Sequence, residues 1–150
     1  MPGVGETAPD FTAVTDTGEE IRLSSLRGRK VVLYFYPKDN TPGCTQEACD
    51  FRDRQAAFEA QNAVVLGVST DSAKSHLGFK SKHGLPFTLL ANPDKELVGT
   101  YGVYREKQQY GRTYMGTVRT TFVIDESGKI AKVFDNVRVK GHADAVLEAI

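Results

Sequence analysis

The two cysteines of the chain, Cys44 and Cys49, are its only thiols and stand five positions apart in the segment TPGCTQEACDF. A thiol can act as a nucleophile, form a disulfide or bind a metal ion. The N-terminal segment MPGVGETAPDF has neither the basic part nor the apolar part of a signal peptide, so we expect the protein in the reducing cytoplasm. In such a compartment two neighbouring cysteines are more often catalytic, redox-active or metal-binding than structural.

Cys44 is predicted to lie in the first turn of a helix. The helix is expected to begin at Thr41 or Gly43 and to extend to Phe58, with apolar residues at helical spacing and Pro42 in the first turn. Free N–H groups and the positive end of the helix dipole favour the thiolate at this position, and a pKa of about 6 would raise the thiolate fraction at neutral pH from about 3% to about 90%. The lower pKa also reduces nucleophilicity, by about tenfold. A fast enzyme would therefore have to activate the electrophile as well.

The spacing of the two cysteines is incompatible with a disulfide in an intact helix. Five residues of α-helix give a rise of about 7.5 Å and a Cα–Cα separation of about 8.6 Å, whereas a disulfide requires about 4.4–6.8 Å. Either the two thiols never pair, or the first turns of the helix unwind when they do. The second possibility suits a two-step reaction in which Cys44 becomes a sulfenic acid that Cys49 then resolves.

Several polar groups could activate an electrophile beside Cys44. Arg119 lies in an otherwise apolar predicted strand, and its guanidinium could face both the thiolate and a substrate oxygen. Thr41 offers a hydroxyl, the backbone of Gly43 and Cys44 offers N–H donors, and Pro37 can only shape and shield the turn. The alternatives are an Arg119 on an edge strand with its head in water and a Thr41 that merely caps the helix.

The cysteines also have simpler interpretations. Free cysteines are commonly buried and inert, an alternative that is stronger for Cys49 than for Cys44. A zinc site would need two further ligands, and the three histidines, His76, His83 and His142, are scattered along the chain. We expect these histidines at the surface or at helix ends, and no metal.

The elements expected to position these residues follow from the hydrophobic pattern. Their order is ββ-β-α-β-α-β-α-β-β-α, which favours an α/β fold with a mixed central sheet and helices on both faces. The ranges are a hairpin at 11–23, buried strands at 30–36 and 63–69, a helix from 71 or 72 to 84, a short strand and turn at 85–94, a short helix at 95–103, a polar loop at 104–116, a hairpin at 117–137, and a closing helix at 141–150 with Ala145, Val146 and Ala149 inward.

Composition narrows the classes of protein. The chain has 150 residues, 40% of them hydrophobic, without a repeat or linker, which favours a single domain over residues 1–150. Its 19 basic and 19 acidic residues form no block of one charge, which disfavours nucleic acid or an anionic membrane as the partner. No apolar run is long enough to span a membrane.

The combination of these motifs resembles a known family. Pro37-x-x-x-Thr41-x-x-Cys44 together with Arg119 resembles the active-site signature of the peroxiredoxins, which are thiol peroxidases with a thioredoxin-like fold. The segment GCTQEACDFRD, with its Cys-x4-Cys spacing, resembles more narrowly the bacterioferritin comigratory protein or peroxiredoxin Q subfamily. Similar stretches extend over nearly the whole chain, from VGETAPDFTAVTDTGEEIRL to RTTFVIDESGKI.

The resemblance implies a role for each matching residue. Cys44 would be the peroxidatic cysteine, Thr41 and Arg119 would bind and polarise the peroxide, and Pro37 would shield the thiolate. Cys49 would be the resolving cysteine.

The same resemblance implies the course of the reaction. The enzyme would be an atypical 2-Cys peroxiredoxin that reduces hydrogen peroxide and organic hydroperoxides, with the backbone of Gly43 and Cys44 contributing to peroxide binding. An intramolecular disulfide would form and be reduced by thioredoxin or a similar dithiol protein. Glu47 matches a common family position, and we expect it to hold a local charge network at the positive end of the helix. We expect no cofactor, and a monomer.

Two other functions use the same residues. A thiol–disulfide oxidoreductase with a thioredoxin-like fold would be expected to carry Cys-x-x-Cys, which the chain lacks. A redox sensor or binding module would share the first step with a peroxidase, and only catalytic turnover with a thioredoxin system separates the two.

Overall fold

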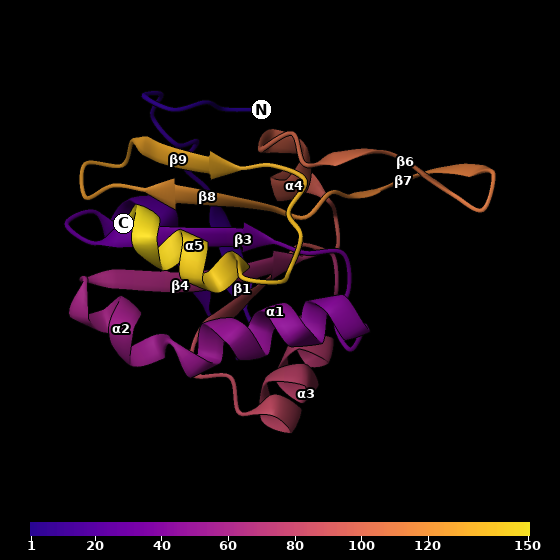
Figure 1. Cartoon of the computed structure of the whole chain (residues 1–150), viewed down its shortest axis with the longest axis horizontal. Coiled ribbons are helices and arrows are strands. Elements are labelled where there is room, and N and C mark those ends of the chain that lie inside the picture. Colours follow the sequence, from indigo (N-terminus) through magenta and orange to yellow (C-terminus); the bar gives the residue numbers. More distant parts are fainter.

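A seven-stranded mixed sheet forms the centre of the molecule. The computed structural model describes residues 1–150, and the strand order is β2-β1-β5-β4-β3-β8-β9. Strands β3, β4 and β5 are parallel to one another, while β8 joins β3 and β1 joins β5 in antiparallel pairs (Figure 1). The strands of this sheet are β1 (Thr12–Thr15), β2 (Glu20–Arg22), β3 (Lys30–Phe35), β4 (Ala63–Ser69), β5 (Thr88–Ala91), β8 (Thr120–Ile124) and β9 (Ile130–Phe134).

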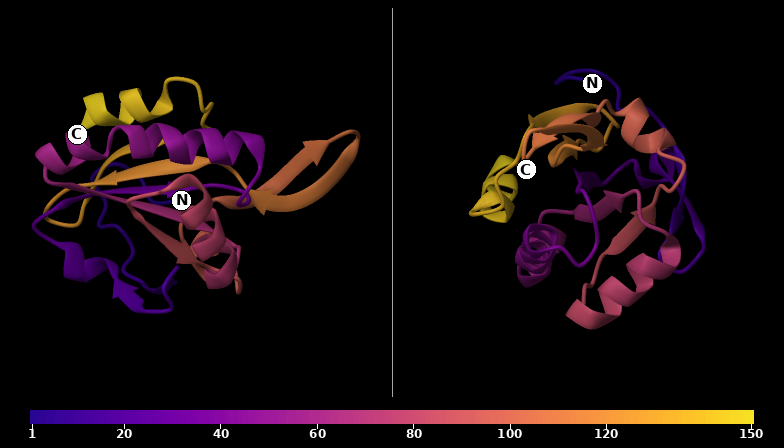
Figure 2. Two further views of the ribbon diagram at one scale, coloured as in Figure 1. Left: turned by 90° about the horizontal axis from the view of Figure 1, so that it is seen from below. Right: turned by 90° about the vertical axis from the view of Figure 1, so that its right-hand side faces the viewer.

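Helices cover both faces of the sheet. The helices are η1 (Leu23–Leu26), α1 (Pro42–Asp53), α2 (Gln55–Ala60), α3 (Ala73–His83), α4 (Glu96–Thr100) and α5 (His142–Ala149). One buried cluster of 16 residues includes side chains of η1 and α4, and a second of 16 includes side chains of α1, α2, α3 and α5. Figure 2 shows α1, α3 and α5 gathered on one side of the twisted sheet. The predicted architecture, a mixed sheet between helices, is therefore confirmed.

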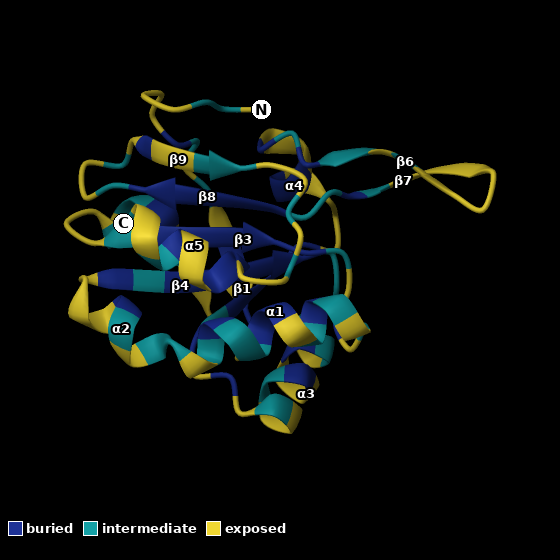
Figure 3. Ribbon diagram, viewed as in Figure 1, coloured by how far each residue is buried: buried dark blue, intermediate teal, exposed yellow.

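Strand β3 is buried on both faces, as its continuous apolar sequence predicts. Val31, Leu33 and Phe35 belong to one core, while Val32 and Tyr34 belong to the other. Alternation of side chains along a strand produces this division. The strand therefore ends, just before Pro37, as a rigid support for the loop that leads into α1 (Figure 3).

The segment 104–116, predicted to be a polar loop, is instead a hairpin. Strands β6 (Tyr104–Gln109) and β7 (Arg112–Thr117) pair with each other and project beyond the main sheet (Figure 1). Tyr110 and Gly111 between them both have positive φ, 52° and 75°, as a two-residue type I′ turn requires. The prediction was wrong because most side chains on both faces of this ribbon are polar or exposed, so no apolar alternation marks the strands.

Three local predictions also need correction. The helix expected to extend from Thr41 or Gly43 to Phe58 breaks at Arg54 into α1 and α2, and the short helix η1 was not predicted. In α5, Val146 is buried as expected, but Ala145 and Ala149 are exposed.

None of the helices has the length and apolar character needed to cross a membrane.

Candidate active site

Cys44 lies in the first turn of α1, as predicted. Thr41 is the N-cap residue and Pro42 the first helical residue, so the N–H groups of Gly43 and Cys44 lie where the helix itself provides no acceptor. The side chain of Cys44 is 1% exposed and packs into the core cluster beneath α1. The thiol is thus held at the positive end of a helix and shielded from bulk water.

Arg119 connects the thiol to a buried carboxylate. Its Nη2 donates to Sγ of Cys44 at 3.4 Å, and its Nη1 donates to Oε1 of Glu47 at 2.6 Å. The residue lies between β7 and β8, not inside a strand as predicted, and its side chain is 15% exposed. A Cβ on residue 43 would lie 3.2 Å from Nη2, so Gly43 leaves the space that the guanidinium occupies.

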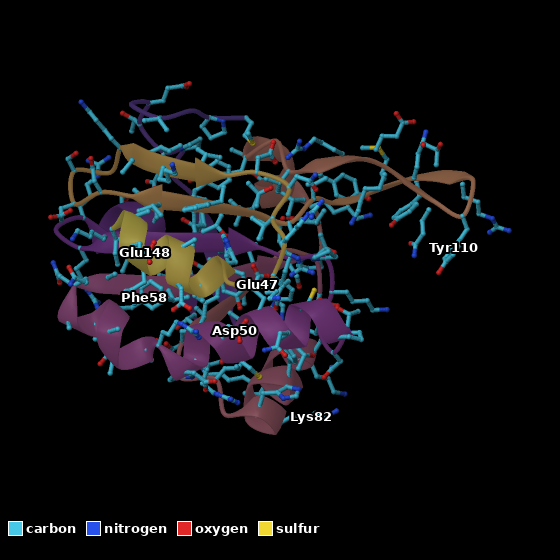
Figure 4. The ribbon with its side chains drawn as sticks, viewed as in Figure 1. Glu47, Asp50, Phe58, Lys82, Tyr110 and Glu148 are labelled. Atoms are coloured by element: carbon cyan, nitrogen blue, oxygen red, sulfur yellow. The ribbon has the colours of Figure 1, made fainter.

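Glu47 is held in a strongly desolvated position. Figure 4 places it on α1, on the side of α5, and its side chain is 1% exposed. Oε2 has no hydrogen-bond partner. It lies 3.9 Å from Nε2 of His142. Burial raises the pKa of Glu47 to about 7, against the attraction of Arg119.

Burial and neighbouring charges also shift the pKa values of Arg119 and His142. Burial by itself lowers the pKa of Arg119, but the negative charges of Glu47 and Cys44 outweigh burial and place it above its ordinary value. Burial lowers the pKa of His142 to about 4, and the Arg119 charge acts in the same direction. His142 is therefore neutral at pH 7, with Nε2 hydrogen-bonded to Oγ1 of Thr121 at 2.8 Å.

Thr41 and Pro37 lie in the loop between β3 and α1. The hydroxyl of Thr41 donates to the carbonyl oxygen of Lys38 at 2.8 Å and makes no side-chain bond to the helix, so the structure does not show it as a side-chain cap. Its lone pairs, rather than its proton, remain available toward a ligand in this conformation. Pro37 has no N–H group and lies beside Arg119 in the wall of a pocket.

That pocket is the nearest route to the guanidinium. It has a volume of about 590 Å³ and lies between the base of the β6–β7 hairpin and the end of β9. Pro37, Val118 and Val137 contribute apolar or backbone surface. The charged residues of the lining are Arg105, Glu106, Lys107, Arg119 and Asp135. Burial, followed by the Arg119 charge, lowers the pKa of Lys107.

Cys49 lies on the same intact helix as Cys44. Both residues fall within α1, both thiols are free, and Cys49 is half-buried. Regular helical geometry places their Cα atoms about 8.6 Å apart. The structure is therefore a reduced form in which these two sulfur atoms cannot bond without a change in α1.

One of the three histidines is not where the sequence placed it. His83 is the last residue of α3 and His142 is the first residue of α5, so both fit the expectation of helix-end residues, although His142 is only 5% exposed. His76 lies inside α3 and is 0% exposed. His142 faces the Glu47–Arg119 pair, and His76 faces Asp39 in the loop before α1. Their partners lie far away in the sequence, so local spacing gave no signal for either contact.

Comparison with known proteins identifies the family. The profile of the AhpC/TSA family matches residues 4–133. Peroxiredoxin Bcp of Bacillus subtilis is 46% identical over 147 residues, which cover 98% of this chain and 94% of that protein. The chain therefore belongs to the AhpC/TSA family, within its peroxiredoxin Bcp or peroxiredoxin Q branch.

Solved structures agree with this assignment. The bacterioferritin comigratory protein of Xanthomonas campestris, studied for its alkyl peroxide reduction activity, superposes with a TM-score of 0.89 at 40% identity, covering 93% of this chain and 88% of that one. A cysteine-to-serine mutant of Xylella fastidiosa PrxQ superposes with a TM-score of 0.94 at 37% identity, covering 99% of this chain and 94% of that one. The thioredoxin-like fold is confirmed, and the family indicates a thiol peroxidase.

Proposed function

We propose that the protein is a thioredoxin-dependent peroxiredoxin of the atypical 2-Cys type, in which Cys44 reduces the peroxide and Cys49 resolves the product. The observation that carries the proposal is the contact between Nη2 of Arg119 and Sγ of Cys44 at the free N-terminus of α1, beside an open pocket. This contact supports the activation of the electrophile that the sequence argument requires, because the guanidinium lies beside the sulfur that a peroxide must approach.

In the first step the Cys44 thiolate attacks one oxygen of a hydroperoxide ROOH. An S–O bond forms, the O–O bond breaks, and the products are a Cys44 sulfenic acid and RO⁻, which takes a proton from water. Sulfur loses two electrons and the peroxide gains them. Arg119 and the N–H groups of Gly43 and Cys44 stabilise the charge that grows on the oxygens. Thr41 binds the hydroperoxide by accepting a hydrogen bond from its O–H group, while Pro37 shields the thiolate.

In the second step the Cys49 thiol attacks the sulfenic sulfur. A disulfide forms and water leaves. Because α1 holds the two residues too far apart, its first turns unwind in this step. The far end of α1 remains attached, since Arg54 binds Asp144 of α5 and donates to the carbonyl of Asp50 at 2.8 Å.

A dithiol protein then completes the cycle. Its two thiols become a disulfide, and Cys44 and Cys49 return to thiols by exchange. Thioredoxin in a reducing cytoplasm is the proposed reductant, because free thiols persist in such a compartment. The pairing occurs within one chain, so we propose that a monomer, comprising a single domain over residues 1–150, is sufficient. The chemistry uses side chains and backbone alone, without a cofactor.

The test combines rapid mixing with mass spectrometry of the peptide that contains both cysteines. The protein is mixed with hydrogen peroxide or with an alkyl hydroperoxide, quenched, and analysed for sulfenic acid and disulfide. We expect the sulfenic acid at Cys44 first and the Cys44–Cys49 disulfide next. Absence of any reaction of Cys44 with either peroxide would refute the proposed function.

The variant Cys49→Ser separates the two steps. We expect it to retain one peroxide turnover at close to the rate of the unchanged protein, because Cys49 takes no part in the attack. Steady-state turnover with thioredoxin as sole reductant should fall by at least about tenfold, because no disulfide forms for thioredoxin to reduce. Unchanged steady-state turnover would show that Cys49 is not the resolving residue.

A further inference from the structure

A second buried polar cluster lies beside the loop that carries Pro37 and Thr41. Its centre is Asp39, which is 4% exposed and lies midway between these two residues. Burial of a carboxylate is costly unless several donors surround it. The surroundings of Asp39 meet this condition with groups from three separate parts of the chain.

Each oxygen of the Asp39 carboxylate accepts hydrogen bonds. Oδ1 accepts from the hydroxyl of Tyr36 at 2.5 Å, and Oδ2 accepts from Oγ of Ser75 at 2.8 Å and from Nδ1 of His76 at 2.7 Å. The backbone N–H of Asp39 donates to Oδ2 of Asp71 at 2.8 Å. The loop is thereby tied to the beginning of α3 and to the turn after β4.

Both ring nitrogens of His76 lie within hydrogen-bonding distance of acceptor oxygens. Nε2 lies 3.0 Å from the carbonyl oxygen of Leu90, and Nδ1 lies 2.7 Å from Oδ2 of Asp39. Burial raises the pKa of Asp39, but the hydrogen bonds from His76 and Tyr36 outweigh it and hold the pKa below its ordinary value. Asp39 and His76 thus form a buried hydrogen-bonded pair.

The cluster is complete without a metal ion. Asp39, Asp71 and His76 lie close enough to share one. However, Nδ1 of His76 donates to Asp39, and the oxygens that face the cluster centre already accept hydrogen bonds. Because these atoms already bond to one another, the arrangement is a hydrogen-bonded support for the loop.

We propose that the buried Asp39–His76 pair is a latch that positions Thr41 and Pro37 for the peroxide reaction and restrains the unwinding of α1 afterwards. This inference rests on the proposed function. The loop 37–41 is the covalent connection between β3 and α1, so the first turn of α1 cannot unwind freely while Asp39 is fixed to α3. Asn40, between Asp39 and Thr41, has a φ of 63°, a conformation that the fixed ends of the loop maintain.

The latch therefore acts on two competing fates of the sulfenic acid. Resolution by Cys49 requires unwinding and yields a disulfide and water. Attack by a second hydroperoxide requires none and yields a Cys44 sulfinic acid and the alcohol ROH. A stronger restraint lengthens the life of the sulfenic acid and favours the sulfinic product, whereas a weaker restraint favours the disulfide.

The variant Asp39→Asn tests the latch, because the amide has the same shape but replaces one acceptor oxygen of the carboxylate with an NH₂ group. We expect the first reaction with hydrogen peroxide to slow about tenfold through misplacement of Thr41. We expect disulfide closure to accelerate about tenfold and the sulfinic yield at a given peroxide concentration to fall. Ser75→Ala, which removes one of the three side-chain donors to the carboxylate, should shift both rates in the same directions by a smaller factor.

Asp16→Asn is the matched control. Asp16 is 3% exposed, accepts from the N–H of Leu89 at 3.0 Å and from Lys80 of α3 at 3.1 Å, and does not contact the loop 37–41. It should lower thermal stability without changing the ratio of disulfide to sulfinic acid. If both variants lose stability but only Asp39→Asn slows the reaction with peroxide and accelerates disulfide closure, the loss of stability does not explain these changes.

The measurement is rapid quenching after a pulse of hydrogen peroxide, with mass spectrometry of the four states of Cys44. Opposite changes in the two rates for Asp39→Asn, absent in Asp16→Asn, support the latch. If the ratio of disulfide to sulfinic acid in Asp39→Asn and Ser75→Ala equals that of the unchanged protein or of Asp16→Asn, the latch does not exist. Failure of the unchanged protein to form a sulfenic acid would refute the proposed function instead.

Discussion

Two buried carboxylates, Asp39 and Glu47, flank the turn that holds Cys44, and their surroundings differ. Asp39 is 4% exposed and accepts three side-chain hydrogen bonds, whereas Glu47 is 1% exposed, pairs through one oxygen with Arg119 and leaves the other unpaired. The pKa of Asp39 lies below its ordinary value, and that of Glu47 is raised to about 7. The donors to Asp39 outweigh its desolvation, whereas the desolvation of Glu47 outweighs its pairing with Arg119.

The two carboxylates therefore differ in whether their charge changes near neutral pH. Asp39 stays ionised at every pH near neutrality and fixes the loop before α1. Glu47 changes its charge near neutral pH and so alters the charge that pairs with Arg119, which contacts Cys44. One carboxylate supports geometry, and the other adjusts the electrostatic field at the thiol.

The largest expected effect belongs to the residue that Glu47 holds. Arg119→Ala should reduce the rate of the first reaction with peroxide by about 10²–10³, because a donor to the developing negative charge is lost. Stopped-flow kinetics give the rate, and ultraviolet absorbance of the thiolate gives the ionised fraction of Cys44. Arg105→Ala is the control, since Arg105 lines the same pocket but pairs with Asp135. A rate that follows the thiolate fraction alone would contradict electrophile activation by Arg119.

The next effect distinguishes the two carboxylates by pH. Since the pKa of Glu47 is raised from 4.5 to about 7, the folded protein binds this proton more tightly than the unfolded chain does. The resulting stabilisation is fully present below about pH 4.5 and is lost as the pH rises through about 7, a difference of about 3 kcal/mol. Glu47→Gln should remove this slope, so the unchanged protein should lose more stability between pH 5 and 8 than the variant.

Chemical denaturation at several pH values measures this slope. His142 is present in both proteins, so its opposing contribution cancels in the comparison. Asp39→Asn serves as the contrast, because the stability that comes from its lowered pKa is lost only as the pH falls below about 4. Equal slopes for the unchanged protein and Glu47→Gln would mean that Glu47 is ionised throughout this range.

The smallest expected effect is that of Gly43→Ala, which acts through Arg119 and Glu47 and not through Asp39. Gly43→Ala places a Cβ 3.2 Å from Nη2 of Arg119, whose Nη1 donates to Glu47 at 2.6 Å. The guanidinium must therefore shift by a few tenths of an ångström. We expect the rate of the first reaction to fall about tenfold. Stability should stay equal or rise slightly, because alanine favours the helix more than glycine does. A variant that loses stability but keeps its rate would show that this space does not govern Arg119.

Much of the site was predictable from sequence because its central residues lie close together in the chain. Thr41, Pro42 and Gly43 specify the start of a helix, and the spacing of Cys44 and Cys49 fixes their separation on it. The buried strands of the sheet were also predictable, because each is marked by a continuous apolar sequence. Arg119 was identified by its chemistry, a charge among apolar neighbours, although it lies at a break between strands and not within one.

The supporting residues were not predictable from such signals. His76 lies 37 positions from Asp39, and His142 contacts Glu47 from the other end of the chain. A histidine on a helix has the same local pattern whether it faces water or a carboxylate, so only tertiary structure distinguishes the two cases. The β6–β7 hairpin escaped prediction because it has few apolar residues to alternate.

Amide hydrogen exchange on the reduced and the peroxide-treated protein tests the central claim most directly. We predict that treatment yields the Cys44–Cys49 disulfide, that the amides of residues 45–49 lose their protection, and that those of residues 55–60 keep it. A disulfide-bonded protein in which the amides of residues 45–49 remain as protected as in the reduced protein would contradict the account.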